Sequence, residues 1–292
     1  MKEKISIRFF DDREVRSVWN DADSRWWFSV LDIVGVLNDQ DNYEKNRNYW
    51  KYLKAKLKGG NIRLGSGTTQ LKLTAPDGKK RLSDVIDSDG VIALAKNIPN
   101  TKANRFIEWF IYSPETIDGK SKSKAYALFE STFINSIETG TVKGLQQIHS
   151  YLFGGLYDFA GLVRTKNISK GGFKFAGAKY LPDTLAAIEK MPDDTIENVV
   201  NKYTEMNVAH PFMEGNGRTA RIWLDLILKK NHSCCVDWSK INKNDYLEAM
   251  RLSVTDNSIL KKLIANALTD KINDREIFMK GIDYSYYYEE TE

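Results

Sequence analysis

The chain has 292 residues, of which 42% are hydrophobic and 28% are charged. This composition is typical of a globular protein, and the length favours two domains over one. Its two cysteines are the neighbours Cys234 and Cys235, so we expect neither a disulfide framework nor a zinc site. No apolar run approaches the length of a membrane span, and no signal peptide follows Met1. We therefore expect a cytoplasmic protein without a membrane partner.

The net charge of +4 is unevenly distributed. Residues 1–110 hold 20 of the 43 basic and 15 of the 39 acidic residues, a balance of +5, and the remainder balances at −1. Between Glu44 and Asp77 there are eight basic residues and no acidic one. A nucleic-acid partner and a solvated helix face explain this pattern equally well.

The first 112 residues are predicted to form an α+β domain that is rich in tryptophan. Strands are expected at residues 4–10, 15–19, 26–29 and 70–74. Helices are expected at residues 29–37, 42–57, 89–97 and 101–112. Turns are expected at 21–24 and 76–78. Residues 113–124 are polar and contain Pro114 and Gly119, so we predict a linker there.

The second domain, residues 125–292, is predicted to be mainly helical. Helices are expected from residue 144 to 153, from 194 up to His210 and through the apolar segment 222–228. The last of these is almost wholly apolar, which indicates a buried central helix. His149 and His232 are expected to be structural, the latter at a helix end.

Residues 210–221 read His-Pro-Phe-Met-Glu-Gly-Asn-Gly-Arg-Thr-Ala-Arg. A histidine such as His210 can take a proton from a hydroxyl near neutral pH, and a lone carboxylate such as Glu214 can hold Mg²⁺. Glycines let backbone amides approach an anion, and two arginines three apart share one helix face. The segment therefore suits transfer of a phosphate-linked group from a nucleotide to a hydroxyl.

This segment resembles the signature of the Fic family, H-P-F-x-[DE]-G-N-G-R-x-x-R, at every fixed position. Family members typically transfer AMP from ATP to a Ser, Thr or Tyr hydroxyl of a target protein. The resemblance implies that His210 deprotonates the hydroxyl and that Glu214 binds Mg²⁺. It implies nucleotide contacts by Gly215, Asn216, Gly217, Arg218 and Arg221, with Lys170 and Asn207 as further candidates. Relatives that phosphorylate carry lysine at the position of Gly217, so this glycine favours AMP transfer.

Residues 167–180 contain two glycines followed by alternating apolar and basic residues, which predicts a β-hairpin. By resemblance this hairpin is the family's flap, which pairs with the backbone of the target. The flap residues are Phe173, Lys174 and Phe175. An ordinary surface hairpin is the alternative.

The C-terminal residues 285–290 resemble the family's inhibitory motif, [ST]-x-x-x-E-[GN]. Ser285 and Glu289 lie one helical turn apart, and the resemblance implies that Glu289 pairs with Arg221 in place of the outermost phosphate. The departure is Glu290, where the family has Gly or Asn. A frayed acidic tail is the alternative. Tyr286, Tyr287 and Tyr288 are candidate self-modification sites if this segment leaves the pocket.

The segment from Ile5 to Tyr112 resembles the BRO-type N-terminal domain of viral and phage proteins. The resemblance lies in residues 16–19, 27–34 and 71–73 and in hydrophobic spacing around Trp50. It implies DNA binding, through phosphate contacts that do not depend on base sequence. The candidate contacts are Lys45, Arg47, Lys51, Lys54, Lys56 and Lys58.

Taken together, the sequence predicts a protein adenylyltransferase with ATP and Mg²⁺ as substrate and cofactor and with a hydroxyl-bearing target protein. Two alternatives remain: a DNA-binding regulator with a non-catalytic nucleotide-sensing Fic domain, and transfer of another phosphate-linked group. Bacterial relatives often act as toxins, but the motif names no target. A homo-oligomer is compatible with the sequence.

Overall fold

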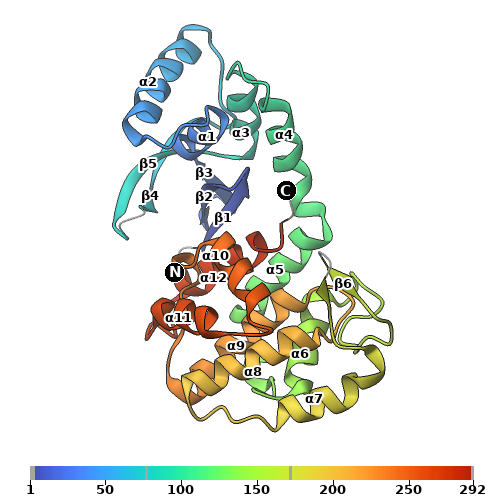
Figure 1. Cartoon of the computed structure of the whole chain (residues 1–292). Coiled ribbons are helices and arrows are strands. Elements are labelled where there is room, and N and C mark those ends of the chain that lie inside the picture. The colour runs from blue at the N-terminus through green and yellow to red at the C-terminus, as the bar shows by residue number, and fades with distance from the viewer. Residues whose placement is uncertain (1–3, 76–77, 171–172, 291–292) are drawn as a thin grey trace. The chain divides into compact units, whose positions relative to one another are not determined.

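The computed structural model describes residues 4–75, 78–170 and 173–290. The chain divides between Thr116 and Ile117 into two compact units. The first combines an antiparallel sheet with helices, and the second is mainly helical with short hairpins (Figure 1). The predicted fold class is therefore confirmed.

The N-terminal unit is built on a five-stranded antiparallel sheet of order β1-β2-β3-β5-β4. The strands are β1 (Lys4–Phe10), β2 (Arg13–Asn20), β3 (Arg25–Ser29), β4 (Thr69–Thr74) and β5 (Lys80–Ile86). The helices are α1 (Val30–Leu37), α2 (Tyr43–Gly59), α3 (Ser88–Lys96), α4 (Ala103–Tyr112) and the short η1 (Ser113–Glu115). Its largest core cluster is formed by helix faces against one side of the sheet and includes Phe28, Ile33, Trp50 and Phe106.

Strand β5 was not predicted from the sequence. It pairs with β4 from Thr74 opposite Lys80 to Thr69 opposite Val85. Its first residues are charged and exposed, and only Val85 and Ile86 are buried, so the alternating pattern of a strand is weak there. Residues 76 and 77 of the predicted turn lie outside the described residues.

The second unit contains eight helices, among the residues that the structure describes, besides its 3₁₀ turns. They are α5 (Ile117–Glu130), α6 (Val142–Phe153), α7 (Leu181–Glu189), α8 (Ile196–Ala209), α9 (Asn216–His232), α10 (Lys243–Leu252), α11 (Ser258–Ala267) and α12 (Arg275–Tyr287). The 3₁₀ turns are η2 (Thr132–Ser136), η3 (Ala178–Tyr180) and η4 (Trp238–Lys240). Two small hairpins pair β6 (Ser169–Lys170) with β7 (Phe173–Lys174), and β8 (Cys235–Val236) with β9 (Leu268–Thr269).

The polar segment 113–124 was predicted as a linker, but it forms η1 and the first half of α5. Ser121 is fully buried within it, and its hydroxyl accepts a hydrogen bond from Tyr286 of α12. The serines and lysines of this segment therefore lie on a helix that packs into the second unit. Among the described residues, no helix is both long and apolar enough to span a membrane.

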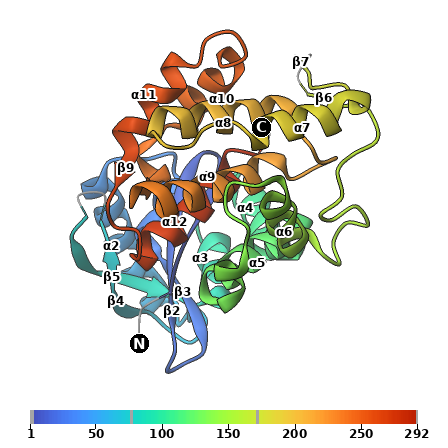
Figure 2. The same ribbon diagram turned by 90° about the horizontal axis from the view of Figure 1, so that it is seen from below.

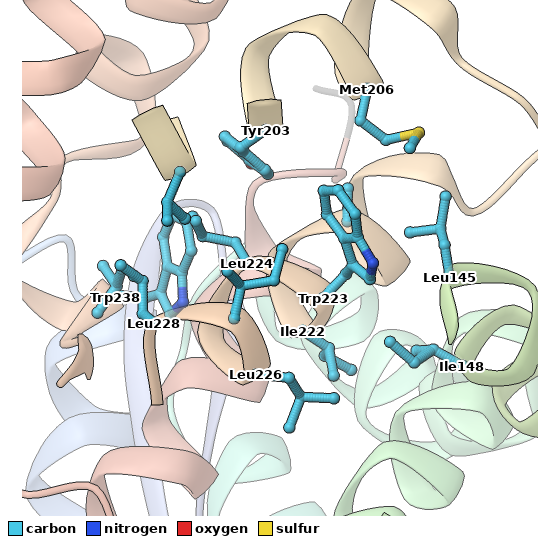
Figure 3. Packing of buried hydrophobic residues seen from close by; sticks show 14 of the residues in the cluster. Leu145, Ile148, Tyr203, Met206, Ile222, Trp223, Leu224, Leu226, Leu228 and Trp238 are labelled. Carbon is cyan, nitrogen blue, oxygen red and sulfur yellow. The ribbon is translucent and has the colours of Figure 1, made fainter. Parts of the chain in front are cut away.

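Helix α9 is the central element of the second unit and packs against α6, α8 and α12 (Figure 2). Its Trp223 side chain is fully buried beside Leu145 and Ile148 of α6 and Met206 of α8 (Figure 3). The apolar run predicted at 222–228 is thus the core of this unit. It fixes the helix that carries Arg218 and Arg221.

Replacing Trp223 with alanine should leave a large cavity at this point. We expect Trp223→Ala to lower the free energy of unfolding by about 3–5 kcal/mol, measured by chemical denaturation followed by circular dichroism. Leu247 on α10 is 43% exposed, and Leu247→Ala should change the same quantity by less than about 0.5 kcal/mol. Equal losses in the two variants would contradict the central position of Trp223.

Candidate active site

The loop between α8 and α9 holds its shape through backbone constraints. His210 ends α8 in the left-handed conformation, with φ of 49°. Asn216 closes the loop, since its side-chain amide donates to the Phe212 carbonyl and its oxygen accepts from the Phe212 N–H, both at 2.8 Å. Gly215 has φ of 80°, and a Cβ there would collide with the Phe153 ring. The loop is therefore fixed before any ligand binds.

Arg164 holds the other side of this loop. Its buried guanidinium donates to the carbonyls of His210 (2.7 Å), Ala209 (3.1 Å), Ala176 (2.5 Å) and Lys166 (2.7 Å). These four hydrogen bonds all go to backbone oxygens, so Arg164 links the end of α8 to the segments on both sides of the β6–β7 hairpin. Burial lowers the pKa of Arg164.

The His210 ring is oriented by two contacts. Its Nδ1 lies 3.0 Å from the Asn207 carbonyl oxygen, which can only accept, so the proton is assigned to Nδ1. The lone pair of a neutral ring is then on Nε2. The Phe175 ring stacks on the imidazole with centroids 3.7 Å apart. His210 is thus presented as a neutral base in a fixed orientation.

Removal of the His210 ring from water lowers its pKa from 6.5 to about 4. The Asn207 carbonyl and the Glu289 charge act in the opposite direction, and Lys170 and Arg164 add to the lowering. The ring is therefore neutral at physiological pH, which is the state required to accept a proton.

Glu214 lies on the exposed side of the loop, with 53% of its side chain accessible. Its Oε1 accepts from the Gly215 N–H at 2.9 Å and from Arg218 at 2.8 Å. The backbone of Glu214 is held by His149. The Nδ1 of His149 accepts from the Gly161 N–H, so the ring proton is on Nε2, which donates to the Glu214 carbonyl at 2.9 Å. Burial lowers the pKa of His149 to about 4.

Arg218 is almost fully buried in the first turn of α9. It pairs with Asp118 of α5 and with Glu214, and its guanidinium lies 5.2 Å from the Phe153 ring centroid and 5.4 Å from that of Tyr286. Its Nε is buried and has no acceptor within the described part of the chain. A buried N–H without an acceptor is costly, and an anionic ligand would supply one.

Arg221, one turn further along α9, is 2% exposed. Its Nε donates to the Ser285 hydroxyl at 2.7 Å, and one terminal nitrogen donates to the Ser285 carbonyl and to Glu289 Oε1, both at 2.6 Å. The other terminal nitrogen donates to the Tyr246 hydroxyl at 3.1 Å. Three of these four contacts come from α12 or the residues just after it.

The Glu289 carboxylate lies directly over the N-terminus of α9. A Cβ at Gly217 would collide with its Oε1, and Lys170 of β6 is 3.5 Å from its Oε2. Burial alone would raise the pKa of Glu289, but Arg221 and Lys170 outweigh burial and hold the pKa at about 2. The first turn of α9 is therefore an anion site that a carboxylate of the same chain occupies.

The three tyrosines before Glu289 differ in accessibility. Tyr286 and Tyr288 are buried, and their hydroxyls donate to Ser121 and to the carbonyls of Trp238 and Ile241. Tyr287 is partly exposed, and Lys243 lies 4.5 Å from its ring centroid.

The predicted flap is a short hairpin in which Ser169 pairs with Lys174 and Lys170 with Phe173. Its turn residues, 171–172, lie outside the described residues. Phe173 and Phe175 make an edge-to-face contact with centroids 5.1 Å apart, and Lys174 is exposed. Asn207 does not reach out of α8, since it is buried and its side chain donates to the Tyr203 carbonyl at 2.9 Å.

The structure thus brings Lys170, His210, the first turn of α9, Ser285 and Glu289 together. Sequence reasoning missed Asp118, Arg164 and Tyr246, which contact the motif from distant parts of the chain. No local pattern marks them.

Known protein families were compared with this chain, and one of them matches the region that contains the site. The model of the Fic/DOC family matches residues 140–228, which include the whole loop from His210 to Arg221. This segment is therefore similar to the Fic/DOC family. The matched segment runs from just before α6 through most of α9, so it includes α8 and most of α9, the two helices that flank the loop.

The curated relatives that this chain matches are named protein adenylyltransferases. Protein adenylyltransferase VbhT of Bartonella schoenbuchensis is 29% identical over 174 residues, which are 52% of this chain and 36% of that protein. The probable protein adenylyltransferase Fic of Salmonella typhimurium is 26% identical over 164 residues, which are 50% of this chain and 82% of that protein. This chain therefore spans only about a third of the first relative.

Two solved structures are similar to about half of this chain. One is the BepC effector of Bartonella tribocorum with bound AMPPNP, at 19% identity and a TM-score of 0.44, covering 53% of this chain and 85% of that chain. The other is the N-terminal Fic domain of a Bep effector from Bartonella sp. AR 15-3, at 18% identity and a TM-score of 0.47, covering 53% and 83%.

The lowered pKa of His210 can be tested directly. The ring should remain neutral at pH 6 and gain a proton only as the pH falls toward about 4. Titration of the imidazole resonances by NMR, with His210→Gln used to assign them, measures this. A midpoint at or above 6.5 would show that the ring is hydrated and not stacked under Phe175.

Proposed function

We propose that this chain is a protein adenylyltransferase that moves AMP from ATP to a hydroxyl of a target protein. One observation carries the proposal. A neutral histidine with its lone pair on Nε2 shares a loop with an anion site formed by a helix N-terminus, Arg218 and Arg221. The Fic/DOC match and the names of the curated relatives support the same reaction.

The chemistry follows from the positions of these groups. His210 Nε2 takes the proton of the target hydroxyl while the hydroxyl oxygen bonds to the α-phosphorus of ATP and pyrophosphate leaves. Arg218 and Arg221 neutralise charge on the phosphates, and the amides at the start of α9 donate to them. Because the loop is already fixed, positioning and charge stabilisation supply most of the rate.

The residues present fit a magnesium ion. Glu214 offers an exposed carboxylate beside the phosphate site, and a single carboxylate suits Mg²⁺, which keeps several waters and shares phosphate oxygens. Among the described residues, no cluster of three or more His, Cys, Asp or Glu forms a closed metal site. When bound, Mg²⁺ would neutralise charge that develops on the phosphate oxygens.

The resting protein would be inhibited by its own C-terminal segment. Glu289 occupies the anion position over α9 and uses a donor of Arg221 that an outer phosphate would need. The resemblance of residues 285–290 to the inhibitory motif supports this role, and Glu290 does not contribute to the contact with Arg221 described above. Self-modification would favour Tyr287, because Tyr286 and Tyr288 become accessible only when α12 unpacks.

Incubation with Mg²⁺ and α-³²P-ATP, followed by gel electrophoresis, tests both parts of the proposal. Glu289→Gly should transfer label to protein faster than the unaltered chain, because the anion site is released. His210→Ala in the Glu289→Gly background should lose about 10²–10⁴-fold in rate, as expected for a general base.

The outcomes separate the alternatives. Equal rates with and without Glu289 would contradict inhibition. Absence of label in every variant, with ATP bound, would favour another donor such as UTP or a phosphocholine compound. Absence of transfer with all donors would favour a nucleotide sensor.

A second function, nucleic-acid binding, is proposed for the N-terminal unit, which resembles BRO-type domains. Helix α2 buries Asn46, Trp50, Leu53 and Leu57 and leaves its basic side chains exposed. These exposed residues are Lys45, Arg47, Lys51, Lys54, Lys56 and Lys58. Arg47, Lys51 and Lys54 also line an open hollow of about 540 Å³ between α2 and β5. Lys54 pairs with Asp84 at 2.9 Å, so it is the least available of them.

Neutralising three of these residues should weaken DNA binding. The variant Arg47→Gln, Lys51→Gln, Lys58→Gln should bind duplex DNA less tightly, and its log affinity should depend on log salt with a slope smaller by up to ~2.7, since each phosphate contact contributes about 0.9. Fluorescence anisotropy at several salt concentrations measures this. The variant Lys190→Gln, Lys230→Gln, Lys262→Gln has the same net charge and alters exposed lysines of the second unit. Equal effects of the two variants would contradict a site on α2.

A further inference from the structure

The Arg221 guanidinium has one partner that does not belong to the C-terminal segment. Its contacts with Ser285 and Glu289 all come from α12 and the second residue after its end. The fourth contact is the Tyr246 hydroxyl of α10, at 3.1 Å. This contact holds the terminal nitrogen that neither Ser285 nor Glu289 contacts, so it does not depend on Glu289 occupying the anion site.

Tyr246 is itself held in place independently of Glu289. It is 2% exposed, and its hydroxyl lies 2.6 Å from the hydroxyl of Tyr203 on α8. Its ring makes an edge-to-face contact with Trp238, with centroids 5.8 Å apart, and the Arg221 guanidinium lies 5.5 Å from its centroid. A buried hydroxyl that is fixed on two sides can keep an arginine in one rotamer without a charged partner.

The tyrosine pair also connects the two halves of the site. Tyr203 lies on α8, and its carbonyl accepts from the Asn207 side chain. The Asn207 carbonyl in turn accepts from His210 Nδ1. A continuous set of contacts therefore runs from Arg221 on α9 through Tyr246 on α10 to the end of α8, where His210 is oriented.

We propose that Tyr246 is a positioning residue, which keeps Arg221 directed at the outermost phosphate when Glu289 has left the site. The proposal rests on the proposed adenylyl transfer, and it adds a residue outside the 210–221 motif to the machinery. Tyr246 would act through Arg221 and would not touch the reacting atoms. Its hydroxyl, and not its ring, is the group that matters.

Tyr246→Phe tests the hydroxyl, because phenylalanine keeps the edge-to-face contact with Trp238 and removes only the hydroxyl oxygen. In the full-length Glu289→Gly chain, the dissociation constant of a non-hydrolysable ATP analogue with Mg²⁺ should rise about tenfold on Tyr246→Phe, as expected for loss of a hydrogen bond to a charged group. The dissociation constant of AMP should stay within about twofold. AMP lacks the outer phosphates that Arg221 would contact. Isothermal titration calorimetry measures both.

Tyr288→Phe in the same background is the matched control. It removes a buried hydroxyl from the same ring cluster, but that hydroxyl bonds to the carbonyls of Trp238 and Ile241 and not to Arg221. We expect less than about a twofold change for the ATP analogue. An unchanged affinity in Tyr246→Phe, or the same loss in Tyr288→Phe, would overturn the proposal.

A second measurement keeps this test separate from the proposed function. In the nucleotide-free Glu289→Gly chain, the N–H resonances of the terminal Arg221 nitrogen that donates to Tyr246, assigned with Arg221→Lys, should be lost or broadened by exchange on Tyr246→Phe and retained in Tyr288→Phe. If no nucleotide binds to any variant, adenylyl transfer fails as the function, and these resonances still decide whether Tyr246 positions Arg221. Unchanged resonances in Tyr246→Phe would overturn the proposal by themselves.

Discussion

The arrangement of the second unit depends on the burial of the Arg221 guanidinium. A charge that is 2% exposed needs hydrogen-bond acceptors on every side, because burial without them costs several kcal/mol. Helix α9 cannot supply these acceptors, since its own carbonyls are used within the helix. They come from Tyr246 of α10, from Ser285 of α12 and from Glu289. The positions of α10 and α12 are thus coupled to the charge of Arg221. Removal of any one of these acceptors leaves part of a buried charge without a hydrogen bond and so destabilises the contacts made by the others.

The same physical requirements make this site suitable for both a carboxylate and a phosphate. The first turn of α9 presents free amides and a partial positive charge, and two arginines add full charges. Neither feature distinguishes a side-chain carboxylate from a nucleotide phosphate. Glu289 holds the position because it is part of the same chain and its effective concentration is high. If a nucleotide binds there as proposed, it has to displace Glu289, and its apparent affinity is its intrinsic affinity multiplied by the fraction of molecules in which Glu289 has left the site.

Sequence patterns predicted those parts of the structure that depend on neighbouring residues. The loop from His210 to Arg221 is contiguous, so its chemistry and its two flanking helices could be anticipated, as could the one-turn spacing of Ser285 and Glu289. Strand β5 and helix α5 were missed, because their buried residues are few and their polar residues resemble those of loops. Contacts between distant segments, such as that of Arg218 with Asp118, leave no trace in a single sequence.

Arg164 shows why such contacts matter for the chemistry. His210 adopts a left-handed backbone conformation, which is unfavourable for a residue with a Cβ and persists only when its surroundings impose it. Those surroundings are the four carbonyl contacts of Arg164 and the paired hydrogen bonds of Asn216. None of these groups needs to touch a nucleotide. The left-handed conformation places the imidazole against Phe175 with its Nδ1 proton toward Asn207, so the orientation of the ring is set by residues that contact only the backbone.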